Sequence, residues 1–268
     1  MQEIDEIEEK GPKKMKTILL LLFTATAVNA QLPTLQKDRQ VLLDFRIDRN
    51  IGNTKISAAT QRTVLSKLFR RYLTEESKCN SNFDARGSSD LLAAARKAGE
   101  IVPSIADMAT GSFTGPGKTE TLYVIFVGEC FASHADNFGT RRAAIFSGQQ
   151  LVADVDLDFK QNIERKTDLN SDGVDELLMT SGYTNQGTTT EMAALFSFQN
   201  GRLKVINDFG VTSEDSCASG FPSSKSIASV LYISDVFPGR MPQLTQENYG
   251  SACRRAKRWK LVSKGKMP

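Results

Sequence analysis

The chain has 268 residues and a formal net charge of +3, and 24% of its residues are charged and 40% hydrophobic. This length is enough for one sizeable hydrophobic core or for two small ones. The four cysteines include no Cys-x-x-Cys pair, which argues against a zinc site and against thioredoxin-like chemistry.

The N-terminal residues have the pattern of an export signal. Basic residues at 13–16 precede an apolar stretch at 18–23, and small residues ending at Ala30 suit a signal peptidase. The apolar stretch is too short to span a membrane. We therefore expect residues 1–30 to be a leader and signal peptide, with Met15 as an alternative start. The mature protein is then secreted or periplasmic and has no membrane span.

The pattern of apolar residues in residues 31–110 predicts a helical or α+β part. Residues 40–46 suit a strand, and Ser57 suits the N-cap of a helix that runs to residue 73 with apolar residues three and four apart. A second helix is expected at residues 89–97, ended by Gly99 and a following proline. We interpret the apolar positions of this part as core.

The segment that follows contains two related units. Residues 113–122 align with 169–178, and residues 143–147 align with 193–197, which gives a period in the fifties. A period of this size suits one propeller blade or another strand-rich repeat.

Within each unit the pattern predicts a strand, a loop and a hairpin. Residues 122–127 form an apolar run typical of a strand, and Asn200-Gly201 suits the tight turn of a hairpin. A third, divergent unit is expected from the strand-like residues 227–233 and 258–262.

The second unit contains a loop with the spacing of a calcium site. Side chains with oxygen recur at alternate positions before Gly173, which suits the sharp turn that such loops need. The expected ligands are Asp168, Asn170, Asp172, the Val174 carbonyl and Glu176. The twelfth position holds Met179 where a helical EF-hand needs an acidic residue, so this is not an EF-hand. A turn without metal is the alternative, because the same residue types are common in turns.

A calcium loop followed at once by an apolar strand resembles the FG-GAP repeat of integrin-type β-propellers, over about residues 111–209. The resemblance implies Ca²⁺ bound by the five groups named above. Glu176 stands where Asp is commoner, and the neighbouring Asp175 is an alternative closing ligand. The aligned loop of the first unit has Phe113, Gly115 and Gly117 in this region, so we expect it to keep the turn without the metal.

Together these patterns predict an α+β protein that is mainly antiparallel β. Two or three FG-GAP-like units at residues 111–268 follow the N-terminal part at 31–110, and the two parts can form one compact domain. Because a closed propeller needs about four blades, the units must form an open sheet covered by the N-terminal helices, an incomplete propeller or an assembly.

Four cysteines in an exported chain are expected to pair, and three pairings exist. We favour Cys79 with Cys130 and Cys217 with Cys253.

A basic cluster near the C-terminus suggests an anionic surface or glycan as a partner, although a charged edge strand is the commoner explanation. Its residues are Arg254, Arg255, Lys257, Arg258 and Lys260. Export removes most nucleic acid, so none is expected as a partner.

Catalysis has little support in the sequence. The single histidine, His134, lies in a polar stretch typical of a loop, and no Gly-x-Ser-x-Gly motif is present. No catalytic residue is therefore assigned. An exported binding or structural protein with a structural calcium site is the favoured function. The alternative is a secreted or periplasmic hydrolase with carboxylates such as Glu129, Asp136 and Glu191 in a cleft.

Overall fold

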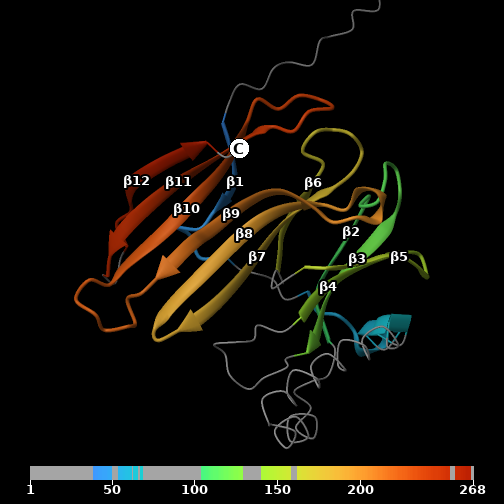
Figure 1. Cartoon of the computed structure of the whole chain (residues 1–268), viewed down its shortest axis with the longest axis horizontal. Helices are drawn as coiled ribbons and strands as arrows, with labels where there is room; N and C mark the ends of the chain where they lie inside the picture. Colours follow the sequence, from blue (N-terminus) through green and yellow to red (C-terminus); the bar gives the residue numbers. More distant parts are fainter. Residues whose placement is uncertain are drawn as a thin grey trace, which may run out of the picture. The chain divides into compact units, whose positions relative to one another are not determined.

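Two antiparallel sheets account for most of the described structure (Figure 1). The computed structural model describes residues 39–49, 54–61, 63–65, 67–68, 104–128, 140–157, 162–253 and 257–266. These residues all belong to one compact unit, Leu35–Pro268. Among them, no helix is long and apolar enough to cross a membrane. The prediction of a mainly antiparallel β protein with open sheets is confirmed.

The smaller sheet contains four strands that neighbour one another in chain order. They are β2 (Ser104–Gly111), β3 (Glu120–Gly128), β4 (Thr140–Ser147) and β5 (Gln150–Asp156). The apolar run predicted as a strand forms the middle of β3, and its side chains Leu122, Val124 and Ile125 are fully buried.

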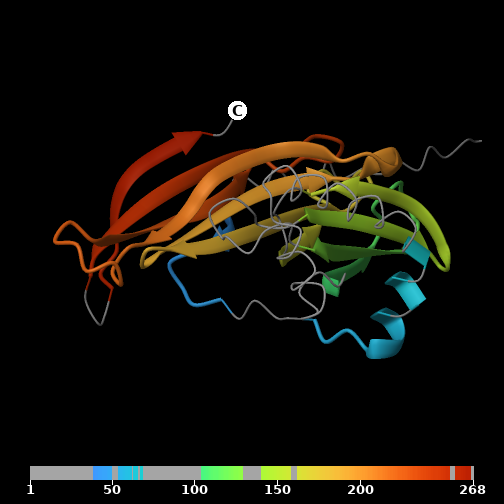
Figure 2. The ribbon, with the colours of Figure 1, turned by 60° about the horizontal axis from the view of Figure 1, so that its bottom comes forward.

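The larger sheet continues the same up-and-down order through seven strands, visible side by side in both views (Figures 1 and 2). They are β6 (Asn162–Thr167), β7 (Glu176–Asn185), β8 (Thr188–Ser197), β9 (Lys204–Asp215), β10 (Lys225–Ser234), β11 (Gln243–Ala252) and β12 (Lys260–Lys266). The short η1 turn (Gln199–Gly201) joins β8 to β9, with Asn200 and Gly201 both at positive φ, 59° and 70°. The hairpin predicted from Asn200-Gly201 is therefore confirmed.

The third unit expected near the C-terminus does not form a separate sheet. β9 has 12 residues, and its far end pairs with β10, with Asp215 opposite Ser226. Strands β10 to β12 therefore extend the sheet of the second unit. Because β9 pairs with β8 along its length and with β10 at its far end, it joins the two units in one sheet. The period of the sequence repeat does not predict this connection.

An eighth strand, β1 (Gln40–Asp44), joins the larger sheet beside β10 (Figure 1). It confirms the strand predicted at residues 40–46. Its buried side chain Leu42 packs with residues of β9, β10 and β11 in a common apolar cluster.

The two sheets share a hydrophobic core. Leu122 and Ile145 of the smaller sheet pack in one cluster with Leu177, Met179 and Phe196 of the larger sheet. All five side chains are at most 4% exposed. Burial of this kind contributes roughly 25 cal/mol per Å² of apolar surface, so the shared cluster is the main reason for the two sheets to stay together.

The helical residues 58–61, 63–65 and 67–68 pack against one face of the smaller sheet. The N–H of Thr60 donates to Oγ of Ser57 at 3.1 Å, which confirms Ser57 as the N-cap. Val64 and Leu68 then pack against Ile125 and Phe146.

One of the two expected disulfides, Cys217–Cys253, is present with a sulfur–sulfur distance of 2.09 Å. Cys79 and Cys130, the helix expected at residues 89–97 and the leader expected at residues 1–30 lie outside the described residues.

Candidate functional site

The acidic loop, residues 168–175, connects β6 to β7 at the end of a hairpin where Thr167 pairs with Glu176. The aligned loop, residues 112–119, connects β2 to β3, where Gly111 pairs with Glu120. We call these two segments the second loop and the first loop. Their equivalent positions confirm the alignment that places Gly117 opposite Gly173 and Glu120 opposite Glu176.

The alternating oxygens of the second loop accept hydrogen bonds from its own backbone. Asp168 accepts from the N–H groups of Asp172 and Gly173, at 3.1 and 2.9 Å. Asn170 Oδ1 also accepts from Asp172 N–H at 3.1 Å, and Asp172 Oδ1 accepts from Val174 N–H at 2.8 Å. The side chains therefore hold the loop in a tight turn, and each ionised carboxylate keeps further lone pairs.

Gly173 is required at its position for two reasons. Its φ is +83°, in the left-handed region, and a Cβ added there would lie 2.9 Å from Cβ of Pro116 in the first loop. The two loops therefore approach each other closely at this glycine.

Glu176 is a buried carboxylate, 1% exposed, at the end of the second loop. Within the described part of the chain it accepts one hydrogen bond, from Leu169 N–H at 2.9 Å, and no ion pair reaches it. Its pKa is raised to about 7: burial raises it most, the Leu169 hydrogen bond lowers it, and the charges of Asp172, Asp168 and Asp175 also raise it. The charged form of Glu176 is therefore poorly compensated.

Glu120, the corresponding residue of the first loop, is equally buried but fully partnered. One carboxylate oxygen accepts from the N–H groups of Phe113 and Thr114, at 2.9 and 2.8 Å. The other accepts from the Thr114 hydroxyl and lies 3.9 Å from Nζ of Lys118. The first loop thus contains its own cation, and Val174 occupies the place of that lysine in the second loop.

Asp175, the alternative closing ligand, belongs to a different contact. Its Oδ2 accepts from Ser112 N–H at 2.8 Å, and its own N–H donates to the Ser112 carbonyl at 2.7 Å. Lys166 lies 3.5 Å from the same oxygen. Asp175 therefore joins the two loops, and Glu176 is the better candidate for closing a metal site.

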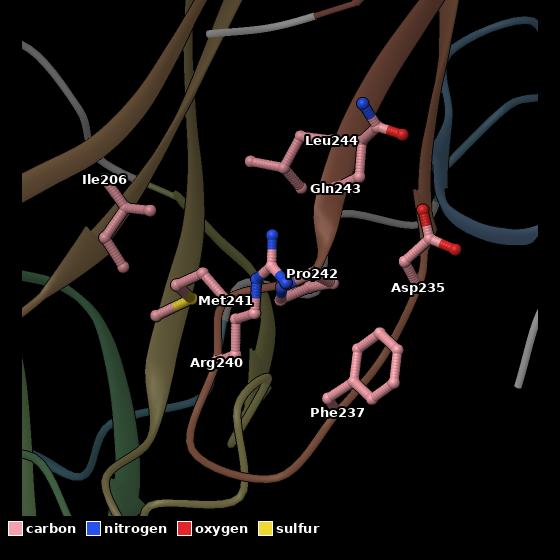
Figure 3. Close-up of a pocket in the computed structure, with 8 residues that line it drawn as sticks. All are labelled: Ile206, Asp235, Phe237, Arg240, Met241, Pro242, Gln243 and Leu244. Atoms are coloured by element: carbon pink, nitrogen blue, oxygen red, sulfur yellow. The ribbon is translucent and has the colours of Figure 1, made fainter. Parts of the chain in front are cut away.

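The second loop also contacts the turn between β10 and β11. Gly239 N–H donates to the Asn170 carbonyl. This turn borders a pocket of about 510 Å³, in which Ile206, Met241 and Leu244 point toward one space beside Arg240 (Figure 3). The second loop thus contacts the first loop, the core and the β10–β11 turn.

The structure does not gather the loop carboxylates into a preformed metal cage. Among the described residues, no three acidic, histidine or cysteine side chains converge as a metal-ligand group. The oxygen-bearing residues lie in one loop, but Asp168 and Asp172 face backbone N–H groups.

The remaining candidate residues are dispersed or outside the described residues. Lys257 is paired with Asp215 at 2.6 Å, whereas Arg258 and Lys260 are exposed. The residues outside the described part are Arg254, Arg255, His134, Glu129 and Asp136.

Sequence reasoning missed the role of Lys118 and the link between Asp175 and Ser112. The alignment of the two loops contained the signal for Lys118, because it places a lysine opposite the buried Val174. The Asp175 contact depends on how the two loops pack and has no sequence signal.

Comparison with known proteins adds no relative. No protein-family model, curated protein or solved structure matches the chain.

Proposed function

We propose that the protein is an exported binding protein whose second loop binds one structural Ca²⁺. The observation that carries this proposal is the contrast between the two buried glutamates. Glu120 has a lysine ammonium beside it, whereas Glu176 lies among three other carboxylates, and no cation of the described residues pairs with it. A divalent cation from solution supplies the missing charge.

Calcium suits the available ligand chemistry. It takes six to eight oxygen ligands at 2.3–2.6 Å, from carboxylates, amide or backbone carbonyls and water. The proposed ligands are Asp168, Asn170, Asp172, Glu176 and the Val174 carbonyl. To bind the ion, the free lone pairs of the loop oxygens turn toward a common centre, and water completes the shell.

The position of the loop gives the ion a structural role. A cation there neutralises Glu176 beside the core residue Leu169 and steadies the carbonyl of Asn170, which holds the β10–β11 turn. The ion is then expected to stabilise the contacts between the two sheets, and no substrate needs to reach it.

Export is supported by the signal-peptide pattern of residues 1–30 and by the Cys217–Cys253 disulfide. The resemblance of the loop to FG-GAP repeats supports the same setting. We place the protein outside the cytoplasm, secreted or periplasmic, with an anionic partner meeting Arg258 and Lys260 as a secondary proposal.

The competing hydrolase function needs an acid with a raised pKa next to a second carboxylate, in a cleft that a substrate can enter. Glu176 has a raised pKa but is only 1% exposed. Of the carboxylates considered for this role, only Glu191 lies within the described residues, and it forms an ion pair with Arg49. For Asp215, on the adjacent strand β9, burial raises the pKa, but hydrogen bonds from Lys257, the Cys217 N–H and Ser226 lower it below its ordinary value. These pairings favour binding over hydrolysis.

Thermal denaturation in calcium and in chelator tests the proposal. With an affinity in the range of about 10⁻⁴–10⁻³ M, calcium at ten times Kd stabilises the fold by roughly 1.4 kcal/mol. Asp172→Ala should abolish this increment, and Asp156→Ala, an exposed carboxylate on β5, should retain it. Equal melting of the wild type in calcium and in chelator would show that the loop is a turn without metal.

A further inference from the structure

The larger sheet divides at β10, and a cleft lies at the fork. β10 pairs with β9 over Ser226–Ala228, whereas over Val230–Ile233 the neighbour on that side is β1. The N–H of Phe45 still bonds to the Ser229 carbonyl at 2.9 Å, and the chain then leaves the sheet through residues 46–49. The space between the departing β9 and the end of β1 is the cleft.

This fork cleft has a volume of about 740 Å³, within the range of roughly 300–1,000 Å³ typical of small-molecule sites. Five parts of the chain contribute to it: the segment after β1, strands β8, β9 and β10, and the segment before β12. Eight of its twelve lining residues are polar or charged, so the cleft suits a ligand rich in hydrogen-bonding groups.

The charges in the cleft are balanced and mostly paired. Three cationic residues, Arg46, Arg49 and Lys257, face three anionic residues, Asp48, Glu191 and Asp215. Arg49 bonds Glu164 at 2.6 Å and also Glu191, and Lys257 bonds Asp215 at 2.6 Å. Arg46 bonds Asp44, just outside the cleft. With no charge in excess, the cleft gives no advantage to an anion or a cation.

The pairing also fixes the polar groups in place. Arg49 is only 10% exposed and stacks on the Phe45 ring, with its central carbon 4.2 Å from the ring centroid. Asp215 is held by Lys257, Ser226 and the Cys217 N–H. Donors and acceptors held by such contacts lose little entropy when a ligand arrives. Glu191 and the exposed Asp48 retain oxygens that can accept from ligand hydroxyls.

Trp259 lines the cleft, and Nζ of Lys257 lies 5.6 Å from the centroid of its ring. It is the one tryptophan of the chain, half-buried against the core cluster that contains Leu42 and Phe209. The face of an indole ring is electron-rich and attracts the weakly positive C–H groups of a sugar ring. An aromatic surface beside fixed donors and acceptors matches a molecule with one C–H face and a rim of hydroxyls.

We propose that the fork cleft binds a neutral oligosaccharide, with Trp259 against the sugar face and Asp48 and Glu191 accepting from its hydroxyls. This inference deepens the proposed binding function by naming its site and ligand class. The cleft is built by residues other than those of the second loop, so it can be tested separately from calcium binding.

Because Trp259 is the only tryptophan, its fluorescence reports on this cleft alone. The mature protein is titrated with maltotriose, cellotriose, xylotriose and chitotriose, each to about 20 mM. At least one is expected to cause a saturable change in emission, with an affinity that varies less than twofold between 0.05 and 0.5 M NaCl, since a neutral ligand has no charge to screen.

Two variants test the assigned contacts. Asp48→Ala should weaken binding at least tenfold, whereas Asp156→Ala on β5 should leave it unchanged. Trp259→Phe should also weaken binding, although it keeps an aromatic side chain in the core. Because this variant has no tryptophan, its binding is measured by calorimetry.

The proposal is overturned if no trisaccharide binds, if Asp48→Ala binds as tightly as wild type, or if sulfated sugars bind instead with strong salt dependence. A calcium melting curve on the same preparation separates the two proposals. Stabilisation by calcium without sugar binding would contradict the proposed sugar site and leave the proposed calcium site standing.

Discussion

The first and second loops have the same place in their hairpins, and each ends in a glutamate that is 1% exposed. In the first loop, Glu120 is surrounded by two backbone N–H groups, a hydroxyl and the Lys118 ammonium. In the second loop, Glu176 has one N–H and three carboxylates nearby. The backbone turn is shared, and the way the buried charge is balanced is different.

The difference shows how one turn can serve two purposes. A buried charge is costly unless a partner and hydrogen bonds compensate it. In the first loop, residues of the loop itself compensate the buried charge of Glu120 as soon as the chain folds. In our proposal a cation from solution compensates the buried charge of the second loop, so the stability of this loop should follow the calcium concentration.

The largest expected effect separates the two glutamates. In the wild type, the Glu120 carboxylate accepts hydrogen bonds from two N–H groups and a hydroxyl. Glu120→Gln replaces one of its oxygens with an N–H₂ group, which cannot accept a hydrogen bond, and should lower the free energy of unfolding by about 2–4 kcal/mol. Glu176→Gln removes one buried charge from four neighbouring carboxylates, so in chelator near pH 7 it should leave the stability unchanged or raise it, because burial already disfavours the charged form of Glu176. Urea denaturation in chelator measures both variants. Equal losses would mean that the two glutamates are compensated alike.

The contact between the loops should give the next largest effect. A Cβ added at Gly111 would lie 2.3 Å from Asp175 Oδ2, so Gly111→Ala should cost about 1–3 kcal/mol. In an Asp175→Ala background the same change should cost clearly less, because the clashing carboxylate is gone. A double-mutant cycle measures this coupling. Additive losses would show that Asp175 does not hold the first loop at Gly111.

A smaller effect should come from the internal cation. Lys118→Met removes the ammonium near Glu120, but Lys118 is half-exposed, so the expected loss is only about 0.5–1 kcal/mol. The loss should shrink as salt screens the pair in the wild type. Val174→Ala serves as the control in the second loop, since its loss reflects apolar packing and should not depend on salt. A salt-independent loss for Lys118→Met would argue against its role as a cation.

A third buried carboxylate extends the comparison to pH. Burial alone would raise the pKa of Glu247, but hydrogen bonds from Arg39, Lys264 and Tyr249 lower it to about 2. Since this folded-state pKa lies below the unfolded value near 4.5, the pairing stabilises the fold above pH 4.5 and is lost as pH falls toward 2. Glu247→Gln should therefore flatten the loss of stability between pH 4.5 and 2. Acid titrations of the variant and wild type that coincide would contradict this assignment.

The sequence predicted the parts of the fold that rest on local chemistry. Apolar runs placed β3 and β10, positive-φ residues placed the Asn200-Gly201 turn, and Ser57 placed the start of a helix. It missed β11, whose sequence QLTQENYGSA is largely polar and lacks a clear alternation. That strand forms because β10 and β12 offer backbone partners on both sides.

The candidate site was predictable in its residues and not in its surroundings. Spacing alone selected Asp168, Asn170 and Asp172, which lie in the second loop, and Glu176, which begins β7 directly after it. The fork at β10 and the cleft beside it depend on β1 and β9 meeting one strand from distant parts of the chain, which no sequence period encodes.

A calcium titration followed by two-dimensional amide NMR tests the central claim most directly. The amide of Gly173 and its neighbours in the second loop should shift saturably with about 10⁻⁴–10⁻³ M affinity. The amide of Gly117, in the loop that contains its own lysine, should shift far less, and Asp172→Ala should abolish the response. Equal shifts at both glycines, or none at Gly173, would contradict the account of one loop balanced by lysine and the other by calcium.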